Sequence, residues 1–103
     1  MIVRLKTGFM EVREYRVEWN RDFLVFVSGA ERRPVRLSDL RSVTVSQPEN
    51  GPARFTLETG AGEYQGSFLR TEDCDEFIRN ARERSACSAE LRLTRNQSAG
   101  KKL

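Results

Sequence analysis

The feature that most constrains the fold is a series of short segments in which apolar and polar residues alternate. Turn-forming residues such as Gly, Pro, Asn and Asp separate these segments every seven to twelve residues. Alternation with a period of two indicates a β-strand that buries one face, and this spacing of turns is typical of an all-β barrel or sandwich. We therefore predict seven short strands, within Ile2–Lys6, Met10–Trp19, Phe23–Val27, Val35–Leu37, Val43–Val45, Phe55–Leu57 and Tyr64–Leu69.

Three positions add detail to this pattern. Val12 is out of phase with Tyr15, so we expect a β-bulge near Arg13–Glu14. Pro34 has no backbone N–H to donate, which favours an edge strand for the segment that contains it. Gly66 lies inside a strand, where a glycine indicates a bulge or the close approach of another backbone.

A single amphipathic helix is predicted after the last strand, in the stretch TEDCDEFIRNARER from Thr71 to Arg84. Its acidic residues gather in the first turns and its arginines in the last turns, as the helix dipole favours. The apolar residues fall at i, i+3, i+4 and i+7 and form one stripe, which consists of Cys74, Phe77, Ile78 and Ala81. We expect this stripe to pack against the strands.

Seven strands followed by one such helix resemble the pleckstrin-homology (PH) superfold. The segment RPVRLSDLRSVTV, from Arg33 to Val45, is similar to the family's fourth and fifth strands, and RFTLETGAGEYQGSFLRTEDCDEFIRNAR, from Arg54 to Arg82, is similar to its closing hairpin and helix. The resemblance implies a mainly β fold, an open barrel of seven antiparallel strands capped by one C-terminal α-helix. In pattern the chain is closest to divergent bacterial PH-like domains. We accordingly expect a PH-like domain at residues 1–87 and a polar, basic, disordered tail at residues 88–103.

The distribution of charge argues against nucleic acid as a partner. The chain has 18 basic and 15 acidic residues and a net charge of +3. Residues 88–103 hold four of the basic residues (Arg92, Arg95, Lys101 and Lys102) and one acid (Glu90), so residues 1–87 are neutral overall. A neutral body lacks the long-range field that steers proteins to phosphate backbones, and four charges in a tail are too few for tight binding.

A first candidate site is a basic cluster for an anion. The loops that follow the first and third strands open at the same end of a PH-like barrel, which would bring together Lys6, Arg13, Arg32 and Arg33. Such a cluster can hold a phosphorylated lipid headgroup by charge-assisted hydrogen bonds. The PH members that bind phosphoinositides carry [Lys/Arg]-x-Arg on the second strand, whereas Arg13 and Arg16 are three residues apart here. The alternative is a solvated loop end that nearby glutamates neutralise.

A second candidate site is the groove between the fifth strand and the helix. In phosphotyrosine-binding relatives of the PH family, peptides add a strand at this place. The resemblance implies a groove rimmed by Ser42, Thr44, Arg79 and Arg82, which suits an extended peptide with acidic character. The same exposed edge could pair with a second copy and give a homo-oligomer. The alternative is that the two arginines are charges on a wet helix face.

Catalysis is not expected from this sequence. It has no histidine, no glycine-rich phosphate loop and no pair of acids whose spacing implies a shared cleft. Cys74 and Cys87 match no metal or redox motif, so we expect free thiols, no metal site and no cofactor. The longest apolar run, Phe23–Val27, is too short to cross a bilayer, and the first residues lack the apolar stretch of a signal peptide, which favours the cytoplasm.

The sequence thus predicts a non-enzymatic interaction or scaffolding module that binds a partner segment, or self-associates, at the strand-five/helix groove. The alternative function is a membrane adaptor that binds anionic headgroups at the basic loop end.

Overall fold

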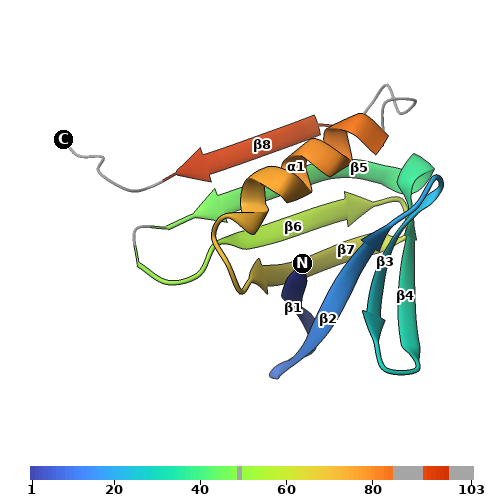
Figure 1. Cartoon of the computed structure of the whole chain (residues 1–103), viewed down its shortest axis with the longest axis horizontal. Coiled ribbons are helices and arrows are strands. Elements are labelled where there is room, and N and C mark those ends of the chain that lie inside the picture. Colours follow the sequence, from blue (N-terminus) through green and yellow to red (C-terminus); the bar gives the residue numbers. More distant parts are fainter. Residues whose placement is uncertain (49, 85–91, 98–103) are drawn as a thin grey trace.

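The computed structural model describes residues 1–48, 50–84 and 92–97, the last range by its backbone. Seven antiparallel strands and one helix after them confirm the predicted PH-like fold class, and Figure 1 shows their arrangement. The elements are β1 (Ile2–Gly8), β2 (Glu11–Trp19), β3 (Phe23–Ser28), β4 (Glu31–Arg36), the short 3₁₀ helix η1 (Leu37–Asp39), β5 (Leu40–Gln47), β6 (Arg54–Thr59), β7 (Gly62–Phe68), α1 (Asp73–Arg84) and β8 (Arg92–Gln97).

The eight strands within the described residues belong to one sheet, in the order β4-β3-β2-β1-β7-β6-β5-β8. The first strand of the chain therefore lies inside the sheet, where Val3 pairs with Tyr15 of β2 on one side and with Phe68 of β7 on the other. In Figure 1, β1–β4 run steeply and β5–β8 run across the view, so the sheet bends between β1 and β7. Pro34 lies in the terminal strand β4, as predicted for an edge.

Residues 92–97 differ from the disordered tail that we expected. They form β8, which pairs in parallel with β5, whereas the other strand pairs of the described residues are antiparallel. The other residues of the predicted tail lie outside the described residues, as does Cys87. An edge strand with unpaired N–H and C=O groups readily takes up another extended segment, which gives a physical reason for this strand.

The predicted bulge near Arg13–Glu14 is wrong. The pairing between β1 and β2 is regular there and shifts instead between Lys6 and Gly8 of β1. Val12 is 58% exposed, on the outer face of the hairpin. The prediction of a bulge assumes that Val12 is a core residue out of register with Tyr15. Val12 is instead an apolar residue on the solvent side, so no bulge is needed.

The prediction of a close backbone approach at Gly66 is confirmed. A Cβ atom built there would clash with the carbonyl oxygen of Arg4 on β1 and would lie 2.5 Å from Cζ of Phe55. A side chain at this position would have to displace either the neighbouring strand or a core aromatic ring. The glycine therefore lets β1 and β7 meet over the ring of Phe55.

The helix packs by the stripe that the sequence predicts. Cys74, Phe77 and Ala81 are fully buried and Ile78 nearly so. The ring of Phe77 lies 5.3 Å from those of Phe55 and Phe68, and 5.4 Å from Trp19 of β2. One helix side chain thus joins β2 to β6 and β7, and α1 also lies against β5. Among the described residues, no helix is long and apolar enough to cross a membrane.

Candidate interaction surfaces

The edge of β5 carries a continuous parallel ladder with the chain's own residues 92–97. The register runs from Ser42 opposite Arg92 to Gln47 opposite Gln97, without a shift. On its other side β5 pairs with β6. Figure 1 shows β8 as the outermost strand beyond β5, on the side where α1 lies. The strand-five edge that we predicted as a peptide groove therefore already holds an extended segment.

The predicted rim residues of that groove lie on different faces of the molecule. Ser42 donates a hydrogen bond from Oγ to Oε1 of Glu58 on β6, at 2.9 Å, so its side chain faces away from the core. Thr44 has the same phase along β5 and is likewise half-buried, while Val43 between them is buried in the core beneath α1. Ser42 and Thr44 therefore lie at the strand edge but do not form one polar rim with the helix.

Arg79 and Arg82 are exposed on α1, next to the buried Ile78 and Ala81. Neither arginine makes an ion pair with another described residue. Since α1 lies against β5, these two arginines are on the element next to this edge. The side chains of the helix thus supply charge, and the backbone of β5 supplies hydrogen bonds.

The basic residues predicted for an anion site are mostly paired with acids. Arg13 Nη1 donates to Glu31 Oε1 at 3.0 Å, and Arg33 Nε donates to Glu31 Oε2 at 2.8 Å. Arg32 Nη2 lies 3.8 Å from Glu18 Oε1. Arg33 Nε also lies 2.9 Å from the hydroxyl oxygen of Tyr15, to which it donates. Three of the four cations therefore contact a carboxylate, with Glu31 shared by Arg13 and Arg33, and Glu18 shared by Arg32 and Arg16.

The pKa values reflect the same pairing. Burial is the largest single effect on Glu31 and acts to raise its pKa, but hydrogen bonds from Tyr15 and Arg33 and the charges of Arg33 and Arg13 outweigh it. The pKa of Glu31 is therefore lowered. The pKa of Arg33 is raised, chiefly by its hydrogen bond with Tyr15, with Glu31 adding to the effect. Glu31 thus stays charged at neutral pH and holds both arginines.

Lys6, the fourth predicted cation, lies elsewhere. Its side chain lines a cleft on the outer face of the sheet together with Arg54 of β6, and Arg32 and Arg33 are not part of that lining. The structure therefore does not assemble the four residues into one anion site. The cleft itself was missed by the sequence reading, because it forms from strands that are far apart in the chain.

β8 was also missed, although the sequence holds a signal for it. Leu91 and Leu93 alternate with Arg92 and Thr94, the same period of two that identified the other strands. The basic composition of the surrounding tail outweighed this short pattern. Cys74 is buried in the core, as its position in the predicted apolar stripe indicates.

Comparison with known proteins supports the fold alone. No family model matches the chain, and no curated protein matches it in sequence. Among solved structures, the chain is similar to inner membrane complex sub-compartment protein 3 (ISP3) of Toxoplasma gondii, a PH-like protein, with a TM-score of 0.67 and 13% sequence identity. The similarity covers 87% of this chain and 77% of that protein. The chain thus has a PH-like fold. Its expected similarity to divergent bacterial PH-like domains stays a prediction.

Proposed function

We propose that this chain is a non-enzymatic interaction module of PH-like fold, whose β5 edge binds an extended protein segment as an added strand. The observation that carries the proposal is the ladder between β5 and β8, in which the chain's own residues 92–97 occupy that edge along its length from Ser42 to Gln47. Strand addition draws its affinity from main-chain hydrogen bonds, so a partner segment can use the same edge without sharing this sequence.

β8 lies at the end of the sheet, which supports an exchangeable strand. The buried residues of β5 are Leu40, Val43 and Val45, and they pack in the core cluster with residues from β1–β7, η1 and α1. β8 joins the sheet at its end and pairs with β5 alone. The occupant of this edge can therefore come from the same chain, from a second copy or from another protein. Arg79 and Arg82 favour a partner segment with acidic side chains.

A peptide-binding experiment tests this proposal on the full-length protein. The double substitution Leu93→Pro/Thr94→Pro removes two consecutive backbone N–H groups from β8, one of which must face β5. A fluorescein-labelled peptide of residues 90–99 should bind this variant in an anisotropy titration. It should bind the unmodified protein about tenfold or more weakly, because the tethered β8 competes at a millimolar effective concentration.

The matched control carries two prolines outside β8, as Ala99→Pro/Gly100→Pro, and should behave like the unmodified protein. A second control is the peptide with prolines at its own Leu93 and Thr94 positions, which should not bind. The proposal fails if the labelled peptide binds neither variant, or if it binds the proline-containing peptide equally well. Light scattering of the unmodified protein at increasing concentration then measures whether the donor strand is exchanged between copies.

The alternative of headgroup binding at Lys6, Arg13, Arg32 and Arg33 has less support. Glu31 pairs with Arg13 and Arg33, and Glu18 lies 3.8 Å from Arg32, so an incoming phosphate would compete with these two carboxylates. We therefore do not propose that site.

A further inference from the structure

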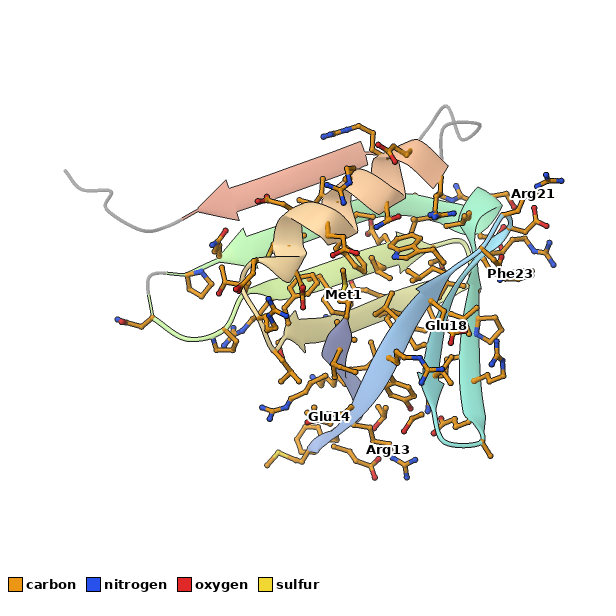
Figure 2. All side chains as sticks on the ribbon, viewed as in Figure 1. Met1, Arg13, Glu14, Glu18, Arg21 and Phe23 are labelled. Atoms are coloured by element: carbon orange, nitrogen blue, oxygen red, sulfur yellow. The ribbon has the colours of Figure 1, made fainter. Side chains whose placement is uncertain are left out.

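The tip of the β1–β2 hairpin exposes large apolar side chains. Phe9 and Met10, in the turn between the two strands, are 91% and 87% exposed, and Val12 follows on β2. No described residue covers them. Figure 2 shows Arg13 and Glu14 near this tip, at the opposite end of β2 from Arg21 and Phe23. Isolated apolar residues on a surface are ordinary, but a contiguous group at a projecting tip marks a contact site for a partner.

A cleft of about 450 Å³ lies beside this tip, between the hairpin and the outer surface of β6 and β7. It forms where the strands diverge: β1 pairs with β7 only from Val3 to Leu5, and the hairpin beyond Lys6 leaves the sheet. Gly66 is part of the lining, and the ring of Phe55 is buried on the core side of the sheet. The cleft thus has polar and cationic side chains on the sheet side and Phe9, Met10 and Val12 on the hairpin side.

Uncompensated positive charge surrounds this apolar surface. Lys6 and Arg54 line the cleft and make no ion pair with any described residue. Arg4 also lines it, and its contact with Glu14 is 3.8 Å long between exposed groups. Glu11 is the one acid in the lining, and its Oε1 accepts a hydrogen bond of 3.4 Å from Thr7. The cleft therefore combines apolar walls with an excess of cations.

We propose that this cleft binds an extended segment of a protein partner that carries an apolar side chain next to acidic residues. The apolar side chain would lie against Phe9, Met10 and Val12, and the carboxylates would pair with Lys6 and Arg54. The lining residues come from both the β1–β2 hairpin and the strands β6 and β7 and form a concave surface, which favours a peptide over a flat bilayer. This surface is separate from the β5 edge, so it adds a second site to the proposed function.

A selection from a random 12-residue peptide library tests the proposal on the full-length protein. The library is first depleted on the double variant Phe9→Ser/Lys6→Glu, and the remainder is selected on the unmodified protein. Enriched peptides should combine Asp or Glu with an aromatic or aliphatic residue. A synthetic peptide of the enriched sequence should bind about tenfold or more weakly to Phe9→Ser and to Lys6→Glu, as expected for an anchor and for its charge partner. Its affinity should fall as salt is raised.

Matched controls alter the same chemistry elsewhere. Leu69→Ser replaces a half-exposed apolar residue outside the cleft lining, and Arg21→Glu reverses a charge at the other end of β2; neither should change the affinity. The Leu93→Pro/Thr94→Pro variant should retain binding, which separates this site from the β5 edge. The proposal is overturned if no peptide is enriched, or if the enriched peptides bind the Phe9→Ser/Lys6→Glu variant equally well. It is also overturned if Phe9→Ser and Lys6→Glu abolish binding to phosphatidylserine vesicles while no peptide binds, since the tip would then be a membrane contact.

Discussion

The two ends of the sheet differ in what prevents their edge strands from pairing with another chain. β4 ends the sheet on one side with the sequence ERRPVR, in which Pro34 cannot donate a hydrogen bond and Arg32 and Arg36 are exposed. Arg36 also lies over the ring of Phe23, 5.0 Å from its centroid. β5 has none of these features from Ser42 to Gln47, a stretch without proline, glycine or charge. Here the edge is covered by a strand, β8.

This difference separates a closed edge from an accepting one. Proline and charge on an edge strand prevent pairing with any other chain, whereas a covering strand prevents it only while it stays in place. The composition of an edge thus distinguishes a permanent boundary from a binding site. For this protein it identifies β5, and not β4, as the edge that can exchange its partner.

The largest expected difference in stability is between a proline placed in β5 and a proline placed in β4. Thr44→Pro should destabilise the fold by about 3 kcal/mol or more, because β5 lies between β6 and β8 and any backbone N–H there has a strand beside it. Arg32→Pro should lower the free energy of unfolding by about 1 kcal/mol or less. Arg32 is two residues from Pro34 on the terminal strand, so its backbone N–H points the same way as the position where Pro34 lacks one. Urea unfolding followed by the fluorescence of Trp19 measures both. Equal losses would remove the distinction between the two edges.

Opening the β4 edge should change association more than stability. Pro34→Val with Arg32→Thr restores a backbone donor and removes a charge, and we expect the stability to stay within about 1 kcal/mol of the original. The variant should associate in a concentration-dependent way that light scattering detects. Arg16→Thr, on the interior strand β2, is the control and should stay unchanged. A monomeric double variant would mean that these residues do not guard the edge.

Removing β8 should have a small effect on global stability and a local effect on β5. Leu93→Pro/Thr94→Pro should cost about 1 kcal/mol or less, because the hydrogen bonds of the ladder are offset by the entropy of ordering the segment. Hydrogen exchange of the backbone amides from Ser42 to Gln47 should become faster, while exchange in β3 and β4 should stay the same. A loss of several kcal/mol would show that β8 is part of the folded core.

The smallest expected effect is the change in stability with pH that Glu31 of β4 contributes. Because the pKa of Glu31 is lowered in the folded protein, its charge contributes stability above its unfolded pKa, and this contribution is lost as the pH falls through the lowered folded value. Glu31→Gln should therefore lower the urea midpoint at pH 7, and its difference from the unmodified protein should shrink as the pH falls below the unfolded pKa of Glu31. Glu76→Gln, on the exposed face of α1, serves as the control. A difference that does not shrink with falling pH would assign the effect to packing and not to charge.

The sequence predicts those features that depend on local patterns. The strands, the helix and its buried stripe follow from periods of two and of 3.6 residues, and the contact at Gly66 follows from the absence of a side chain within a strand. Val12 led to a wrong bulge, because periodicity cannot tell an exposed apolar residue from a core residue out of register. The reason for its exposure becomes visible only when Phe9 and Met10 are seen beside it.

The candidate sites were less predictable, because each depends on non-local geometry. The cleft brings Lys6 of β1 next to Arg54 of β6, and nothing near either residue in the sequence indicates that proximity. Likewise, Glu31 lies 18 residues from Arg13 yet is its partner. A list of basic residues at one end of a barrel cannot show which of them are already neutralised by acids on a neighbouring strand.

The central position of β1 has a consequence for how the chain folds. Since Val3 pairs with Phe68, β1 completes its pairing only after β7 has been synthesised. The hairpins β1–β2 and β3–β4 can form early from local contacts, whereas the closure of β1 on β7 brings together distant segments and should limit the folding rate. A newly made chain therefore exposes one side of β1 until β7 arrives, and the residues around Gly66 complete the sheet last among the antiparallel strands.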